Sequence, residues 1–298
     1  MNERYPRIRV RTQGGTLQVR EGLSFIFYMR HPQQVVAPGA MRSLEAYLRA
    51  VGPQALGWYA DEEGELQKLD EAGWERIHRE MRAERWANVH LDDVNLSDAH
   101  HRFEYHGRQL VDLLGRDDPN QVSTISFWFP SAFLEAHGPN RVRELALELA
   151  SPLPFCSGYA GLAFNAELDL LGISEQVAQR CFRYPGMDIS RLEWKLGTRL
   201  WGVQWLTFLG QPVLGELGGP AGLRARLQEP DTTVQEMDGE RAVVTLGKWP
   251  EAGDTEQSQV LPAYRELARV LEPWLYQGDR GLHFSPEEER RWVRRFLD

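Results

Sequence analysis

Leu23-Ser24-Phe25-Ile26-Phe27-Tyr28 is a strongly apolar run near the N-terminus, and it sets the fold class. A run of about four to eight such residues is typical of a strand that is buried in a sheet. Apolar residues then recur at spacings of three and four, which predicts a helix that buries one face. These residues are Met41, Leu44, Tyr47, Leu48 and Val51, and Gly52-Pro53 follows them as a stop signal.

A second strand and helix with the same pattern follow about a hundred residues later. Ile125-Ser126-Phe127-Trp128-Phe129 is the second apolar run, and a helical stripe over residues 142–149 comes after it. Nine residues of the first unit recur in the second at an offset of 101 or 102 positions. The match favours a duplicated strand–helix–strand unit. Because any two strand–helix units share such a pattern, an unrelated origin stays open.

The remaining elements mix strands and helices without a regular alternation. Strands are expected around Phe103 and Tyr105, at Trp194–Leu200 and at Val203–Phe208, and a capping box at Ser285 predicts a final helix. This mixture favours an α+β fold with mixed sheets and packed helices over a doubly wound α/β fold. Turn-forming residues cluster at 117–120. We therefore expect either one compact domain, 1–298, or two intimately packed halves, about 1–118 and 119–298.

Composition excludes several classes of protein. The chain has 298 residues, of which 42% are hydrophobic, and a formal net charge of −9. These values are typical of a soluble globular protein, and the negative balance argues against direct binding of nucleic acid. No apolar stretch reaches the roughly 20 residues of a membrane span and no secretory signal is found, so we expect a cytoplasmic protein without membrane contact. Cys156 and Cys181 are expected as two buried thiols, with a disulfide as the alternative.

Signatures of catalysis and of cofactor binding are not recognisable in the sequence. It contains no phosphate-binding loop and no paired cysteine or histidine motif of a zinc site. A strand would place His100, Glu104 and His106 on one face, and a solvated face is a simpler interpretation than a metal site. Cys156-Ser157 precedes a glycine, but no histidine is placed to activate either residue. We therefore predict no catalytic residue, no cofactor and no metal.

Acidic residues gather in two segments. Residues 61–75 contain seven acids and one base, and residues 229–256 contain eight acids and two bases. Such segments are either solvated loops or a docking face for a basic protein, whose approach the charge steers. Aromatic residues, which often anchor interfaces, directly precede the first segment. We predict a partner-binding site there, made of Trp58, Tyr59, Asp61, Glu62, Glu63 and Glu65.

Several short motifs, taken in their order and spacing, resemble one family. They are Gly57-Trp58-Tyr59-Ala60-Asp61, Phe127-Trp128-Phe129-Pro130, Leu153-Pro154-Phe155-Cys156-Ser157-Gly158, Phe182-Arg183-Tyr184-Pro185-Gly186, Trp205-Leu206-Thr207-Phe208-Leu209-Gly210 and Pro250-Glu251-Ala252-Gly253-Asp254. Across roughly residues 5 to 298 the chain resembles the type VI secretion immunity family called TsiV. No single motif is decisive, and these apolar and glycine-rich motifs are typical of packing and turns.

The resemblance implies a protein that is not an enzyme. Members of the family are expected to bind a cognate antibacterial effector, often a VRR-Nuc nuclease toxin, and to block its active site or its DNA. An acidic face suits such a partner, because nuclease domains carry basic surfaces for DNA. Two alternatives stay open: an adaptor of the secretion system, and an enzyme with an unrecognised site. The sequence assigns neither the toxin nor an oligomeric state.

Overall fold

The computed structural model describes residues 5–96, 101–111, 115–278, 280–282 and 284–298. The chain forms two compact units, and neither is continuous in sequence. The terminal unit comprises Met1–Ser24, Ser157–Arg191 and Thr198–Asp298, and the central unit comprises Phe25–Cys156 and Leu192–Gly197. The division expected from the sequence, either one domain of residues 1–298 or two halves at about 1–118 and 119–298, stays a prediction.

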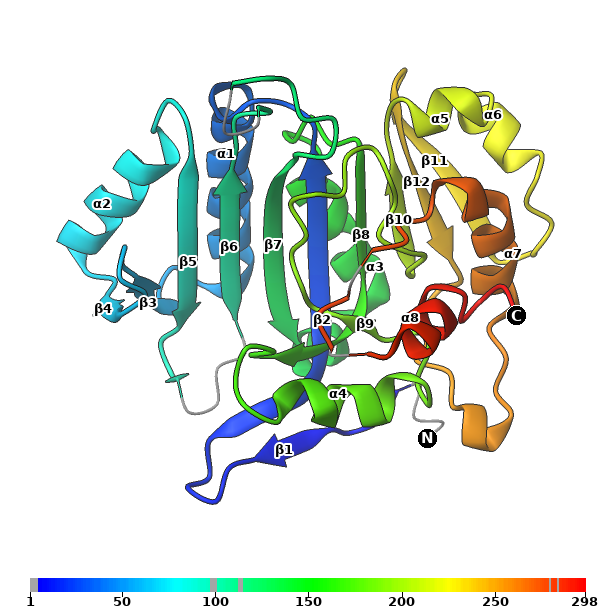
Figure 1. Ribbon diagram of the computed structural model, residues 1–298, viewed down its shortest axis with the longest axis horizontal. Helices are drawn as coiled ribbons and strands as arrows, with labels where there is room; N and C mark the ends of the chain where they lie inside the picture. Colours follow the sequence, from blue (N-terminus) through cyan, green and yellow to red (C-terminus); the bar gives the residue numbers. More distant parts are fainter. Residues whose placement is uncertain (1–4, 97–100, 112–114, 279, 283) are drawn as a thin grey trace. The chain divides into compact units, whose positions relative to one another are not determined.

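An antiparallel sheet with helices packed on one face forms the central unit (Figure 1). In this view α1 and α3 lie behind the strands. The strands in spatial order are β7 (Ser123–Pro130), β6 (Arg102–Gly107), β5 (Ala87–Asp93), β3 (Leu56–Ala60) and β4 (Leu66–Lys68). The C-terminal part of β2 (Leu17–Met29) also belongs to this unit, and its helices are α1 (Gln33–Val51), α2 (Glu71–Met81) and α3 (Ser131–Ala150).

Alternation along the central strands separates an inner face from an outer face. Phe103 and Tyr105 of β6 are fully buried on the helix side. The Tyr105 hydroxyl donates a hydrogen bond to Oε1 of Gln33 at the start of α1. The ring of Phe127 lies 5.3 Å, between centroids, from that of Tyr47 on α1. Aromatic burial of this kind stabilises the inner face.

Helix α1 packs against α3 and against the chain that follows α3. The Ser43 hydroxyl of α1 donates a 2.8 Å hydrogen bond to the carbonyl of Leu149 in α3. A Cβ atom at Gly39 would lie 2.3 Å from the carbonyl oxygen of Pro152, just after α3. Glycine at position 39 therefore lets α1 pack closely against this segment, because no larger side chain fits there.

The terminal unit contains the other strands of the described chain. Its antiparallel strands in order are β11 (Thr232–Asp238), β12 (Arg241–Leu246), β10 (Leu206–Leu209) and β8 (Ser157–Ala166), while β9 (Asp188–Ile189) pairs in parallel with β8. Strand β1 (Arg9–Arg11) pairs with the N-terminal part of β2. Its helices are α4 (Ile173–Cys181), α5 (Val213–Glu216), α6 (Gly219–Arg224), α7 (Pro262–Leu271) and α8 (Pro286–Val293), with 3-10 turns at Thr255–Gln257 and Glu272–Trp274.

Local signals in the sequence explain the ends of two helices. Ser285 and Glu288 form the predicted capping box at α8: the serine hydroxyl accepts from the backbone N–H of Glu288, and the glutamate accepts from that of Ser285. In the central unit, Oδ1 of Asp70 accepts a 3.0 Å hydrogen bond from the backbone N–H of Gly73 and caps α2. Each cap satisfies an N–H group that the helix itself leaves without a partner.

The predicted α+β class is confirmed, and most expected elements are present. The apolar run at 23–28 lies within β2, the second run within β7, and the predicted helices correspond to α1, α3 and α8. The strand expected at Trp194–Leu200 is wrong, because these residues run as turns and irregular chain. Cys156 and Cys181 are separate buried thiols. None of the helices in the described part of the chain combines the length and apolar character that crossing a membrane requires.

Candidate partner-binding face

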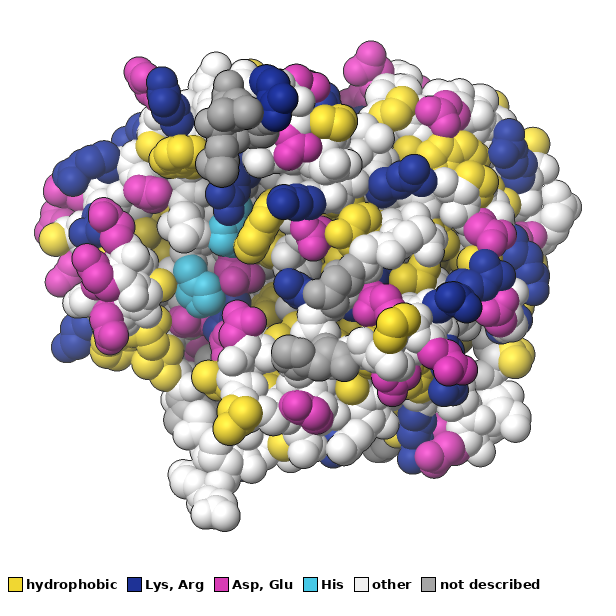
Figure 2. Space-filling view, in the orientation of Figure 1, with side chains coloured by type: hydrophobic (Ala, Val, Ile, Leu, Met, Phe, Trp, Pro, Cys, Tyr) yellow, Lys and Arg dark blue, Asp and Glu magenta, His cyan; other side chains and the backbone are white. Residues whose placement is uncertain are grey.

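The outer face of the central sheet is polar, in contrast to the inner face. Along β5, Val89 and Leu91 are fully buried, whereas His90 alternates with them and stays 27% exposed. The register places His90 opposite Glu104 of β6, and Asp92 opposite Arg102. Figure 2, in the orientation of Figure 1, shows histidine among acidic and basic side chains over β5 and β6. This face therefore carries a charged ladder across neighbouring strands.

Hydrogen bonds connect the members of this ladder. His90 Nε2 lies 2.9 Å from Oδ2 of Asp92, and His90 Nδ1 lies 3.1 Å from Oε1 of Glu104. Arg102 donates to Oδ1 of Asp92 at 2.9 Å from Nε and 2.8 Å from its terminal nitrogen. The Arg102 guanidinium also lies 4.3 Å from the centroid of the Trp128 ring. Two carboxylates thus bind one imidazole between them. Arg102, stacked on the Trp128 ring, donates to one of these carboxylates.

The ladder favours the charged forms of His90, Asp92 and Glu104. Burial opposes the charge of His90, but its hydrogen bonds with Asp92 and Glu104 outweigh burial and raise its pKa to about 9. Burial likewise opposes the charges of Asp92 and Glu104, yet His90 and Arg102 hold both carboxyl pKa values below their usual range. A histidine that keeps its proton at neutral pH is a structural cation and cannot accept a proton in catalysis.

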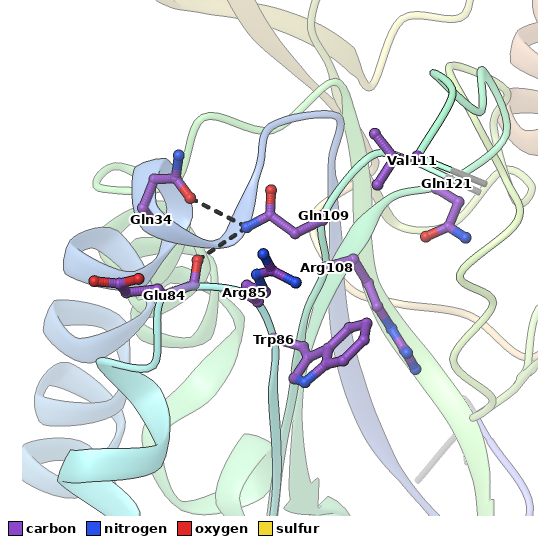
Figure 3. Close-up of a pocket in the computed structure, with 9 residues that line it drawn as sticks. Gln34, Glu84, Arg85, Trp86, Arg108, Gln109, Val111 and Gln121 are labelled. Carbon is purple, nitrogen blue, oxygen red and sulfur yellow. Dashed lines mark hydrogen bonds between the residues drawn. The ribbon is translucent and has the colours of Figure 1, made fainter. Parts of the chain in front are cut away.

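A groove of about 950 Å³ opens at one end of this face, where α1, β5 and β6 begin or end (Figure 3). Gln109, just after β6, donates to Oε1 of Gln34 on α1 at 3.1 Å and to the carbonyl oxygen of Glu84 at 2.9 Å. Arg108 and Trp86 lie side by side in the same groove, and Trp86 is 64% exposed. The groove thus combines a large exposed aromatic ring with an arginine.

The predicted site at Trp58 to Glu65 falls on the β3–β4 hairpin. Trp58 pairs with Asp92 and shares the outer face with the charged ladder, and its Nε1–H donates to the carbonyl of Val94 at 3.3 Å. Tyr59 points to the opposite face, where its ring packs against Gly73 of α2. The two aromatic residues of the predicted site therefore lie on opposite faces of the sheet.

The acids of the predicted site have different local roles. Oδ1 of Asp61 accepts hydrogen bonds from the backbone N–H groups of Glu63 and Glu65, so this carboxylate shapes the turn. Glu62 forms a 2.9 Å ion pair with Arg76 of α2. Glu63 and Glu65 are exposed. Three exposed acids therefore stand on a turn that Asp61 holds in place.

The second acidic segment, 229–256, lies in the terminal unit and is partly neutralised there. Asp254 is buried and forms a two-point hydrogen bond with Arg183, at 3.0 and 2.8 Å. Asp238 pairs with Arg241 in the β11–β12 hairpin. Glu236 and Glu240 are exposed. This segment presents less unpaired charge than its sequence suggests.

The structure gives no catalytic or metal-binding arrangement to the described residues among the other candidates from the sequence. Glu104 and His106 lie on one face of β6 as expected, whereas His100 lies outside the described residues. Within the described parts of the chain, no group of three or more His, Cys, Asp or Glu side chains is arranged to hold a metal ion. Cys156 is buried, and its S–H donates to the carbonyl of Tyr28 at 3.2 Å. This contact is typical of a core thiol, not of an activated nucleophile.

Sequence reasoning missed His90, Trp86 and Arg108. The alternation of polar and apolar residues from Trp86 to Asp92 was a usable signal for an outer face. The pairing of His90 with Glu104, 14 positions apart in sequence, was not predictable, because it depends on the register between two strands.

Comparisons with known proteins place the chain in a family. The family model TsiV, described as "Type VI immunity for VRR-NUC", matches residues 40–296. Among solved structures, the Pseudomonas aeruginosa type VI secretion system protein PA0821 has a similar fold, with a TM-score of 0.76 and 21% identity over 97% of this chain and 87% of that one. No curated protein matches. Because the family model matches most of its length, this chain belongs to the TsiV family of type VI immunity proteins.

Proposed function

We propose that this chain binds a cognate antibacterial type VI effector and neutralises it by covering a functional surface of that effector. The description of the family names VRR-NUC, so the proposed partner is a nuclease of that kind. In this proposal the chain catalyses no reaction. The family match over residues 40–296 supports an immunity role that involves most of the chain.

The exposed acidic turn of the β3–β4 hairpin is the observation that carries the proposed mode of binding. Glu62, Glu63 and Glu65 stand on a turn fixed by Asp61, and all residues of β4 are exposed. A nuclease needs a basic surface to hold DNA, and carboxylates in a fixed turn imitate phosphates on such a surface. The same charges speed up the encounter of the two proteins.

The hairpin is too small to be the whole interface. Neutralising a toxin requires a dissociation constant near 1 nM, which corresponds to about −12 kcal/mol. Interfaces of that strength usually bury about 1,600 Å² and depend on a few central anchors. Three acids on a turn supply steering and part of the contact, so other parts of the surface must contribute anchors.

A nuclease assay with the VRR-Nuc protein of the source bacterium tests the proposal. Wild-type chain at a one-to-one ratio should abolish DNA cleavage, and the two proteins should elute together in gel filtration. A variant with Glu62, Glu63 and Glu65 changed to Lys should bind at least about tenfold more weakly at low salt, with a smaller loss at high salt. Asp61 is kept, because its carboxylate holds the turn.

The matched control reverses three exposed acids of the terminal unit, Asp231, Glu236 and Glu240. It makes the same change in net charge and should leave affinity nearly unchanged. Equal effects of the two variants would contradict a specific role for the hairpin. Stable binding to components of the secretion apparatus, without inhibition of a nuclease, would instead support the adaptor alternative.

A further inference from the structure

Arg108, at the end of β6, differs from the other arginine on the outer face of the central sheet. Arg102 is paired with Asp92, whereas Arg108 has no carboxylate partner within the described ranges, and its Nε atom is buried without a hydrogen-bond partner. Its guanidinium lies 5.2 Å from the ring centroid of Trp194, which also belongs to the central unit. In the part of the chain that the structure describes, an aromatic ring is therefore the only group that supports the half-buried charge of Arg108.

This charge is unfavourable for the isolated protein. Burial lowers the pKa of Arg108, and no acid among the described residues counters that effect. Nearby, burial also lowers the pKa of His106, so that imidazole is neutral at pH 7 and adds no repulsion there. A group that costs folding stability is typical of a site whose purpose is an interaction with another molecule.

The surroundings of Arg108 fit an anionic group that is carried by a protein. Arg85 lines the same groove, and the carboxylate of Glu84 points away from it (Figure 3). Trp86 is 64% exposed and Trp194 is 42% exposed. Tryptophan and arginine are the residues most enriched among the energetic centres of protein interfaces.

A polyanion fits this part of the molecule poorly. The acidic turn with Glu62, Glu63 and Glu65 belongs to the same unit, and the chain has a net charge of −9. A nucleic acid would meet these charges along its backbone. One carboxylate on an otherwise basic protein meets Arg108 without that repulsion, and the acidic turn attracts the rest of the partner.

We propose that the Arg108 groove receives an aspartate or glutamate side chain of the effector. The guanidinium of Arg108 makes a two-point hydrogen bond with this carboxylate, and Trp86 packs on the apolar atoms next to it. This proposal rests on the proposed function, because the occupant is a segment of the effector. It supplies the central anchor that the acidic turn lacks.

The experiment measures two quantities for each variant: affinity for the recombinant VRR-Nuc effector by titration calorimetry, and thermal stability of the free chain. Arg108→Met should weaken binding about 30-fold, the loss typical of a central anchor. The free variant should melt at the same temperature as wild type or higher, because Met removes a buried charge without a partner. Trp86→Ala should weaken binding about tenfold, and Arg108→Lys should recover only part of the affinity.

Arg49→Met is the matched control, since Arg49 is an exposed arginine of the same unit and pairs with Glu148. It should leave affinity within about twofold. If wild type binds and Arg108→Met binds equally well, the groove proposal is wrong while the proposed function stands. If wild type neither binds nor inhibits, both proposals are wrong. A lower melting temperature for Arg108→Met, or binding of a DNA oligonucleotide that depends on Arg108, would also overturn the groove proposal.

Discussion

Both units contain a carboxylate, arginine and tryptophan cluster, but hydrogen bonding gives the two clusters opposite electrostatic character. In the central unit, a nitrogen of Arg102 lies 2.8 Å from an oxygen of Asp92, and His90 bonds to two carboxylates. In the terminal unit, the nearest nitrogen of Arg295 lies 3.7 Å from the carboxylate of Asp188. Asp188 accepts a 2.9 Å hydrogen bond from Trp201, and Arg295 lies 4.0 Å from the ring centroid of Trp292.

The pKa shifts run in opposite directions in the two clusters. In the central cluster, mutual hydrogen bonds outweigh burial and favour the charged forms. In the terminal cluster, burial outweighs the attraction between partners: it raises the pKa of Asp188 and lowers that of Arg295 to about 10. The central cluster therefore stabilises its unit, whereas the terminal pair is tolerated because each charge compensates the other.

Removal of one charge from the buried terminal pair should have the largest effect on stability. Asp188→Ala leaves Arg295 without its counter-charge and Trp201 without an acceptor, so we expect a loss of about 3–5 kcal/mol in the free energy of unfolding. Urea denaturation followed by fluorescence measures it. The double variant Asp188→Leu with Arg295→Met should recover most of this loss. A single-variant loss below about 1 kcal/mol would show that the pair is dispensable.

The central cluster should instead respond to pH. The folded pKa of His90, about 9, lies above its ordinary value of 6.5, so its stabilising contribution is complete below pH 6.5 and disappears as pH rises to 9. Asp92 and Glu104 face His90 and stay ionised throughout this range, and Arg102 donates to Asp92 beside them. We expect a fall on the order of 2–3 kcal/mol, measured by urea denaturation between pH 6 and 9.5.

His90→Gln is the control for this prediction, because glutamine keeps hydrogen-bonding groups but does not titrate. Its stability should depend much less on pH across the same window. If the free energy of unfolding of this variant fell with pH as steeply as that of wild type, the pH dependence would belong to another group. The Asp188→Ala variant, by contrast, should retain the slope of wild type, because it leaves the central cluster intact.

The two helix caps should give the smallest effects, and nearly equal ones. Asp70→Ala in the central unit and Ser285→Ala in the terminal unit each remove one acceptor for a helix N–H, so each should cost about 1 kcal/mol. Amide hydrogen exchange in α2 and α8 locates each loss. Asp70→Asn and Ser285→Thr should restore most protection. A loss confined to one of the two helices would contradict equivalent capping.

Elements and caps were predictable from the sequence, whereas pairing between strands was not. The apolar run at 23–28 and the capping box at Ser285 are local signals, and both correspond to observed elements. Trp194–Leu200 was predicted as a strand from its sequence. In the structure, Trp194 and Leu196 belong to an irregular segment of the central unit. The backbone N–H of Val122 donates a 3.0 Å hydrogen bond to the carbonyl of Trp194 and fixes this segment.

In the candidate site, too, local features were predictable from the sequence and contacts between distant segments were not. The acidic turn was visible as a local run of charge, and the structure places its exposed acids on one hairpin. The opposite directions of Trp58 and Tyr59 follow from strand alternation once β3 is known. The Arg108 groove combines residues from α1, the loop before β5 and the end of β6, so no contiguous motif describes it.

The short segment Leu192–Gly197 has a consequence for the order in which the protein is synthesised. It belongs to the central unit, although 35 residues of the terminal unit separate it from Cys156. Gly197 donates a 2.8 Å hydrogen bond to the carbonyl of Asn120, and Trp194 supplies the ring beside Arg108. A nascent chain that ends at Cys156 lacks this ring. The ribosome must therefore translate part of the terminal unit before Arg108 acquires its aromatic support.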